Sequence, residues 1–180
     1  YVGKPPFSYA DAGYSDFAAT SRAAMIYAAA NDGMLHAFDA ATGEEAWAFT
    51  PSAVLPNLYK LADRDYATKH QYYVDGAPIM GDIKVGTVWK TILVGGLNKG
   101  GKAYYALDIT DPSNPKALWE FTDTNLGLSF GKPEITKLKD GVASFITGLK
   151  QAFLDNETFE RSMRLAGGSA ISDTARILMH

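Results

Sequence analysis

The residues with the clearest catalytic spacing are 127–131, Gly-Leu-Ser-Phe-Gly, which satisfy the G-x-S-x-G pattern of serine hydrolases. That motif needs a buried strand before the serine and a helix after it, because the sharp turn between them exposes the hydroxyl. Here a polar loop precedes the motif, and Pro133 opens a predicted strand after it. The only histidine beyond Ser129 is His180. We therefore interpret the motif as a loop and predict no catalytic residue.

A second pattern, G-x-x-x-x-G-K, occurs at residues 96–102 and is typical of phosphate-binding loops. The next residue is Ala103, so the hydroxyl that would bind Mg²⁺ is missing. The segment that follows is predicted to be a strand, so no helix N-terminus would meet the phosphates. These glycines favour a hairpin turn, and we predict no cofactor-binding residue.

Two groups of acidic residues raise the possibility of a metal site. The first group is Asp63, Asp65, His70 and Asp75, but Ala67 and Thr68 stand where a calcium loop counted from Asp63 needs a ligand and a glycine. The second group is Asp108, Asp111 and Asn114, which lie in a segment of ordinary turn formers. Both groups are interpreted as solvated loops, and no metal ligand is predicted.

Three further polar residues favour structural roles. His36 lies in the middle of a predicted strand, on the same side as Met34 and Phe38, and is interpreted as a hydrogen-bonded residue of the core or of a sheet interface. Asp39 and Asp108 each end a predicted strand, where a carboxylate typically accepts backbone N–H bonds.

Aromatic residues recur at matched places in the chain. Trp47 and Trp119, together with the tyrosine pairs 72–73 and 104–105, have flat rings that could stack on a sugar or on a planar cofactor. Aromatic residues at repeat positions more often fill the space between neighbouring sheets. We predict that Trp47 and Trp119 are equivalent buried positions.

The elements that hold these residues form an internal repeat. Residues 25–49 contain three short apolar runs separated by turn residues, which predicts three strands joined by tight turns. Residues 91–121 repeat this pattern, with Asp108 matching Asp39 and Trp119 matching Trp47. The copies are 69 residues apart because residues 51–75 form an insertion. A short helix is predicted at 52–62, with Ser52 as its N-cap and Pro56 in its first turn.

A partial third copy follows, since residues 76–83 resemble residues 131–138 and each looks like the first strand of a four-stranded unit. The expected strands of the complete unit are 78–84, 88–94, 103–108 and 117–121. A further strand is expected at 133–139 and a short helix at 14–20. The pattern predicts an all-β fold, a partial β-propeller of four-stranded antiparallel blades.

The end of the chain is expected to differ from the rest, because the repeat is no longer visible from about Gly141. Helical spacing is present at 149–166, and a last short helix is expected at 170–179. We thus expect a partial propeller of about two blades at 1–140, with its insertion at 51–75, and an atypical tail at 141–180.

Composition sets limits on function. The chain has 180 residues, of which 47% are hydrophobic, so it is long and apolar enough for a sizeable core. A net charge of −3 without a basic block argues against nucleic acid as a partner. No apolar run is long enough to span a membrane. Cysteine is absent, which removes disulfides and thiol chemistry. The chain lacks an initiator methionine, and we expect it to be a fragment.

Longer strings carry a family resemblance. Residues 37–47 resemble the repeat of quinoprotein-like propellers. The chain resembles the C-terminal propeller of the PilY/PilC family of type IV pilus assembly factors and tip adhesins in five segments: residues 1–7, 31–39, 51–58, 104–112 and 125–133.

This resemblance implies a non-enzymatic role in pilus assembly and adhesion. It implies an exported protein at the cell surface or pilus, associated with the outer membrane. It also implies that pilins or minor pilins, and host or surface receptors, are its partners. Some family members bind calcium in an Asp-rich loop, but that loop has no matching residues here, so no cofactor is expected in this chain.

Two alternatives to the pilus role remain open. One is a fragment of a propeller dehydrogenase that uses pyrroloquinoline quinone. Such enzymes close many blades around the cofactor and place a pair of adjacent cysteines over it, which this chain lacks. The other is a truncated remnant without function.

Overall fold

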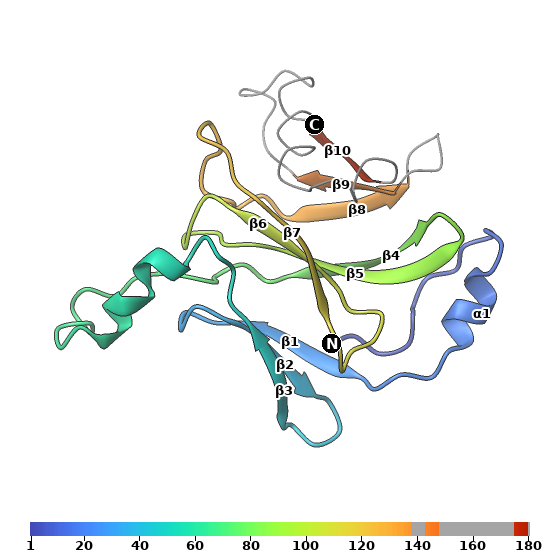
Figure 1. Cartoon of the computed structure of the whole chain (residues 1–180), viewed down its shortest axis with the longest axis horizontal. Coiled ribbons are helices and arrows are strands. Elements are labelled where there is room, and N and C mark those ends of the chain that lie inside the picture. Colours follow the sequence, from blue (N-terminus) through green and yellow to red (C-terminus); the bar gives the residue numbers. More distant parts are fainter. Residues whose placement is uncertain (138–142, 148–174, 180) are drawn as a thin grey trace.

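The computed structural model describes residues 1–137, 143–147 and 175–179, and within them the strands form three sheets that lie as successive layers (Figure 1). Two of the sheets are antiparallel throughout, and helices are few and short. The all-β class expected from the alternation of apolar runs and turn residues is confirmed.

The first sheet consists of β1 (Met25–Ala29), β2 (Leu35–Asp39) and β3 (Glu45–Phe49), paired in sequence order. The two connecting turns contain Gly33 with φ of 98° and Gly43 with φ of 77°. Only glycine adopts such values at no steric cost, so these two residues allow the chain to reverse within a few positions. The three strands predicted in residues 25–49 are confirmed.

The second sheet is a four-stranded meander of β4 (Ile79–Val85), β5 (Val88–Gly96), β6 (Tyr104–Asp108) and β7 (Lys116–Phe121). It matches the four-stranded unit expected between residues 78 and 121. The expected hairpin joins β5 to β6, where the N–H of Gly100 donates to the carbonyl of Leu97 at 2.8 Å. Asn98 takes a positive φ of 50° in this turn, which asparagine tolerates better than most residues.

Equivalent residues of the first two sheets have equivalent partners on the neighbouring strand. Trp47 on β3 lies opposite Ala37, and Trp119 on β7 lies opposite Ala106. A bulge follows the alanine in both cases. Trp47 and Trp119 are therefore equivalent positions, as the repeat predicted, but only Trp119 is buried, so the predicted burial is wrong for Trp47. Three extra residues before Trp119 are absorbed in the turn, and they do not shift the pairing.

The third sheet contains β8 (Pro133–Lys137), β9 (Ala143–Thr147) and β10 (Ala175–Met179). β8 pairs with β9 in antiparallel fashion, and β10 joins β9 in parallel. The helix expected at 170–179 is wrong for residues 175–179, because pairing along the whole of β9 satisfies their backbone as a strand. The helix expected at 149–166 lies outside the described residues.

The two helical segments flank the sheets. Helix α1 (Tyr14–Ala19) confirms the expectation for residues 14–20. The insertion forms a 3₁₀ helix, η1 (Leu55–Ala62), with proline in its first turn as predicted. Ser52 is not its N-cap, since Val54 holds that place. Instead the Ser52 hydroxyl and N–H both donate to the carboxylate of Glu120 on β7, at 2.6 and 2.8 Å.

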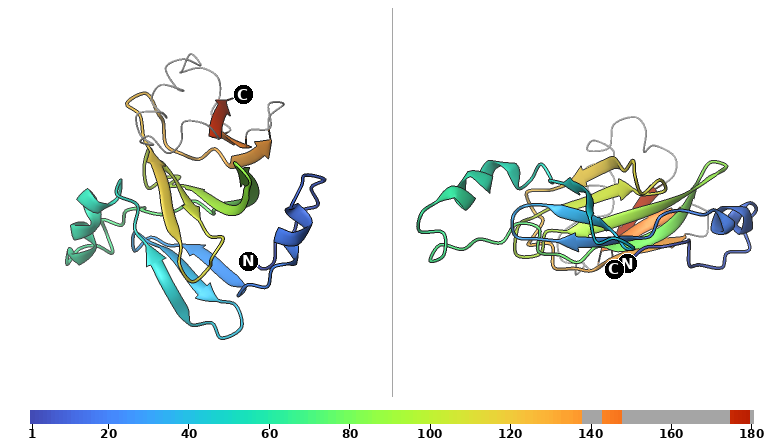
Figure 2. Two further views of the ribbon diagram at one scale, coloured as in Figure 1. Left: turned by 45° about the vertical axis from the view of Figure 1, so that its right-hand side comes forward. Right: turned by 90° about the horizontal axis from the view of Figure 1, so that it is seen from below.

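Two apolar clusters join the three layers. Figure 2 shows the same layers from two further directions. Leu93, Tyr105 and Leu107 on one face of the second sheet pack against the first sheet. The opposite face, with Ile92, Val94 and Trp119, packs toward Ile135 of β8. The second sheet is thus buried on both faces. Among the described residues, no helix is long and apolar enough to cross a membrane.

Candidate functional site

Ser129 is a structural residue. It is fully buried, and its hydroxyl accepts the N–H of Leu97 at 2.9 Å and donates to the carbonyl of Gly101 at 3.0 Å. These bonds hold the loop at 127–131 against the β5–β6 turn, where Ser129 also forms a bridge with Asn98. A hydroxyl engaged by two backbone groups in the interior is not placed to attack a substrate. The loop interpretation of the G-x-S-x-G motif is confirmed.

The glycines before Lys102 serve close backbone packing. A side-chain carbon added to Gly100 would collide with the backbone carbonyl of Tyr73. The carbonyl of Lys102 accepts the hydroxyl of Thr122 at 2.7 Å, which ties the turn to the segment after β7. Residues 96–102 form the end of β5 and a hairpin turn, as predicted, and the strand β6 follows them.

Two acidic residues of the insertion pair with a lysine. Asp63 and Asp65 bond to Lys69 at 3.1 and 3.5 Å, while His70 contacts Tyr72 edge-on at 5.0 Å. The N–H of Asp65 and the ammonium of Lys69 hold the pKa of Asp63 below its usual value. In the part of the chain that the structure describes, no three His, Asp or Glu side chains gather closely enough to hold a metal ion.

The carboxylates that end the second strand of each repeat bind the turns that follow. Asp39 accepts the N–H groups of Thr42 and Ala41 at 3.0 and 2.8 Å, which lowers its pKa. Asp108 accepts the N–H and hydroxyl of Thr110 at 3.0 and 2.6 Å and pairs with Lys90 at 2.8 Å. Burial works to raise the pKa of Asp108, but these bonds outweigh it and lower the pKa. The predicted structural role is confirmed for both.

His36 is held between two carboxylates. Its Nδ1 lies 2.9 Å from Glu45 on β3, and its Nε2 lies 2.9 Å from Asp32 in the β1–β2 turn. The hydrogen bond with Glu45 is the main cause that raises the pKa of His36, and Asp32 adds to it. His36 is thus hydrogen-bonded, as predicted, but it belongs to neither apolar cluster and lies on the face of the first sheet that points away from the second, so its predicted place in the core or at a sheet interface is wrong among the described residues.

The aromatic residues at repeat positions serve packing. Trp119 is only 8% exposed within the cluster toward β8, and Tyr104 and Tyr105 are fully buried. Trp47 is half-buried between the first two sheets, where its ring nitrogen donates to the carbonyl of Pro112 at 2.8 Å. The rings of Trp119, Tyr104 and Tyr105 are buried and offer no open face for a sugar or a planar cofactor, so the packing interpretation holds for them. Tyr72 is different, because it is partly exposed beside Lys99.

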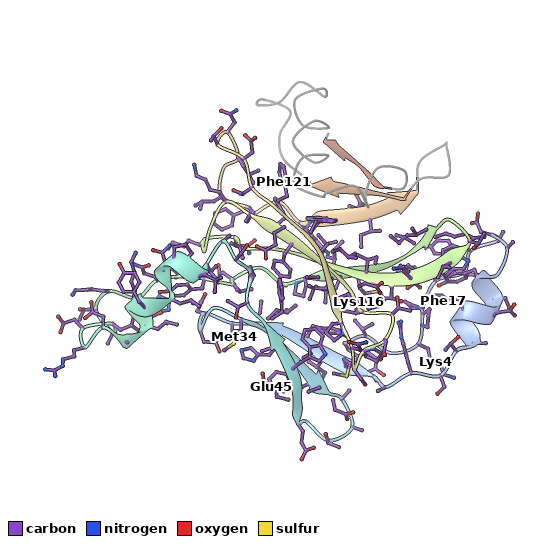
Figure 3. The ribbon with its side chains drawn as sticks, in the orientation of Figure 1. Lys4, Phe17, Met34, Glu45, Lys116 and Phe121 are labelled. Carbon is purple, nitrogen blue, oxygen red and sulfur yellow. The ribbon has the colours of Figure 1, made fainter. Side chains whose placement is uncertain are left out.

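The residues before β1 build an aromatic column that the sequence patterns did not single out as a site. The ring of Tyr9 stacks on Trp89 at 5.6 Å and 6°, and Phe7 stacks on Tyr9 at 5.6 Å and 21°. Tyr14 meets both Tyr9 and Trp89 edge-on, and Figure 3 shows Phe17 of α1 beside the β4–β5 hairpin. The density of aromatic residues between 7 and 17 was the available signal.

A series of hydrogen-bonded polar side chains fixes residues 7–17, here called the aromatic arm, to the second sheet. The hydroxyl of Tyr14 donates to one oxygen of Asp82 at 2.8 Å, and Thr91 donates to the other at 2.6 Å. Arg22 donates to Thr91 at 2.6 Å and to the carbonyl of Gly3 at 2.6 Å. Burial and the bond with Asp82 raise the pKa of Tyr14. The arm is therefore held in a defined position over β4 and β5.

The arm forms one side of a groove between β4 and β8, the candidate binding site of this chain. The groove has two adjoining hollows of about 480 and 380 Å³, which share Ile79, Lys132 and Pro133. The larger hollow is lined by Phe7 and Tyr9, and the smaller by Phe130. Volumes of this size suit small ligands or side chains of a bound polypeptide.

Comparisons with known proteins show which family this chain resembles. A model of the PilY1 beta-propeller domain matches residues 2–158. The match continues beyond Gly141, where the repeat was expected to end. The chain is 48% identical over 141 residues to the type IV pilus biogenesis factor PilY1 of Pseudomonas aeruginosa strain PAO1, and 45% identical over 164 residues to a PilY1 homolog of Xylella fastidiosa.

These alignments cover 75% and 82% of this chain but only 12% and 13% of the two relatives. A crystal structure of the Pseudomonas aeruginosa PilY1 C-terminal domain superposes with a TM-score of 0.67 at 41% identity. That superposition covers 82% of this chain and 30% of the solved chain. The chain thus spans a small part of the length of the relatives it matches.

Proposed function

The chain belongs to the PilY1 beta-propeller family, and on this premise we propose that it serves as a non-enzymatic binding and assembly domain of a type IV pilus biogenesis factor. The observation that carries the proposal is the family match over residues 2–158, together with relatives that are named pilus biogenesis factors. The chain covers only about an eighth of the length of those relatives. Any activity of a whole pilus biogenesis factor is therefore proposed for this chain and is not shown for it.

The bonding of the motif residues supports a domain without catalysis. The hydroxyl of Ser129 is engaged by backbone groups, and the glycines before Lys102 serve a turn. We further propose that this segment holds no cofactor and that any calcium bound by full-length relatives lies elsewhere. The pairing of Asp63 and Asp65 with a lysine supports this part. Addition of calcium or of pyrroloquinoline quinone should leave the thermal midpoint unchanged.

The insertion supports contact with other proteins. η1 projects from the layered sheets (Figure 1) and exposes 73% of Tyr59 and 53% of Leu55. Exposed aromatic and aliphatic side chains on a projecting segment are typical of recognition surfaces. The proposed partners are pilins or minor pilins and surface receptors, and the proposed location is outside the cell, on the pilus or at the outer membrane.

A segment exchange tests the proposal. The matched segment of Pseudomonas aeruginosa PilY1 is replaced by residues 2–158 of this chain, and surface pili are counted by electron microscopy and by sheared-pilin immunoblot. We expect piliation to be retained, and we expect Lys102→Ala in the same chimera to retain it too. Loss of pili with a chimera that is exported and folded would contradict the assembly role. Loss caused by Lys102→Ala alone would contradict the non-enzymatic role.

A further inference from the structure

The outer edge of β4 carries backbone groups that point into the groove. The N–H of Leu97 donates to the carbonyl of Ala103, so every second residue of β5 counted from Leu97 bonds to β6. The residues between them, Ile92 and Val94, therefore bond to β4 through their partners Gly81 and Ile79. It follows that the N–H and C=O of Met80 point away from the sheet.

Nothing in the described part of the chain occupies this edge. β4 is the terminal strand of its sheet, and β8 is the terminal strand of the next, yet the two do not pair with each other. No backbone bond to Met80 from outside its own sheet is found among the described residues. An unpaired strand edge is a template for another extended chain.

The two hollows have the spacing of an extended chain. The larger one is lined by residues 79–81 of β4, centred on Met80, and the smaller one by residues 77–79, centred on Pro78 just before β4. Two residues along a strand correspond to roughly 7 Å, which is the distance between alternate side chains on one side of a strand. A strand laid beside β4 would thus place two alternate side chains into the two hollows.

The rim of the groove favours apolar side chains at those two places. Phe7 borders the larger hollow, stacks on Tyr9 and is 38% exposed. Phe130 borders the smaller hollow and is 59% exposed. Tyr9 stacks with both Phe7 and Trp89 and is 38% exposed. Lys132 and Glu134 on the β8 side supply both charges for polar neighbours.

We propose that this groove binds an extended polypeptide segment of a partner protein, which pairs with the edge of β4 at Met80 and inserts two alternate apolar side chains, one beside Phe7 and one beside Phe130. Main-chain bonds to the strand edge supply affinity, and the two hollows supply selectivity. The inference concerns the groove alone, and it holds or fails independently of the role in pili.

The experiment uses the whole chain and peptides selected on it from a random-peptide display library. Selected peptides should carry apolar residues at alternate positions and bind in fluorescence polarisation. Methylating one backbone nitrogen at a time leaves the protein unchanged. Methylation of the amide that faces Met80 should weaken binding by at least about tenfold, and methylation of the next amide should have little effect.

Protein variants locate the bound peptide. Phe130→Ala and Phe7→Ala should each weaken binding by about tenfold, whereas Tyr59→Ala, at a still more exposed aromatic residue on η1, should not. Failure to enrich any peptide would overturn the proposal, as would binding that is indifferent to Phe130→Ala or to the methylation pattern. A concentration-dependent dimer in sedimentation that Phe130→Ala abolishes would assign the groove to a second copy and also overturn it.

Discussion

Replacement of Trp119 by alanine tests the layered core most directly. Trp119 lies between the second sheet and β8, and its equivalent Trp47 lies between the first two sheets. The two positions share a register and a bulge but differ in burial, since Trp119 is 8% exposed and Trp47 is only half-buried. The pair therefore provides a matched comparison in which the chemistry is the same and the environment differs.

The expected magnitudes follow from the buried area. A fully buried tryptophan removes about 200 Å² from water, of which the alanine methyl retains a small part. At about 25 cal/mol per Å², the loss for Trp119→Ala is about 4 kcal/mol, within the range of about 3–5 kcal/mol for such truncations. Trp47→Ala loses a somewhat smaller buried area, worth about 2–3 kcal/mol, and the bond to Pro112, worth about 1 kcal/mol.

The assay is a guanidinium titration followed by far-ultraviolet circular dichroism, because the substitution removes a fluorophore. The midpoint should fall for both variants and fall further for Trp119→Ala. A Trp119→Ala variant as stable as the parent would show that β8 does not cover this face. A larger loss for Trp47→Ala than for Trp119→Ala would refute the assignment of burial to the two equivalent sites.

Two further substitutions test the polar and backbone features. The pKa of His36 is raised above 6.5, so the stability that its charged form contributes is full below about pH 6.5 and is lost as the pH rises through the raised value. The thermal midpoint should fall across that rise, and His36→Gln should flatten the dependence; a parallel curve for the variant would contradict it. Gly100→Ala should lower the free energy of unfolding by more than about 2 kcal/mol, because the backbone of Tyr73 cannot move aside. Gly127→Ala, which has open space around it, should be near neutral. Equal denaturant midpoints for the two variants would refute this expectation.

The strands and turns of the first two sheets were predictable because local signals agreed with the final packing. Apolar runs alternate with Asn, Asp and Gly at the positions where the chain reverses, and the match of Asp39 with Asp108 fixed the repeat. The roles of both aspartates followed from their place at strand ends. Short-range chemistry decides these features, so the sequence pattern sufficed.

Features that depend on distant partners were not predictable. Ser52 has the chemistry of an N-cap, but it bonds to Glu120, which lies far along the chain. Residues 175–179 carry helix-compatible side chains, yet pairing with β9 makes them a strand. The groove combines Phe7 with residues of β4 and β8, which are far apart in the sequence, so no local pattern predicts it. These contacts are set by tertiary packing, which propensity does not encode.

The first two sheets pack in the same orientation, with the tryptophan-bearing face of each toward the next sheet along the chain. The Trp47 side of the first sheet meets the Leu93 side of the second, and the Trp119 side of the second meets the third. Each contact thus joins unlike surfaces, which makes the stacking heterologous rather than two-fold symmetric. Contacts of this kind propagate head to tail until the rotation closes a ring. The side of the first sheet that points away from the second, with Ile26 and Phe38, corresponds in register to the Leu93 side, so in a head-to-tail stack it is the side that would meet the tryptophan-bearing face of a preceding sheet.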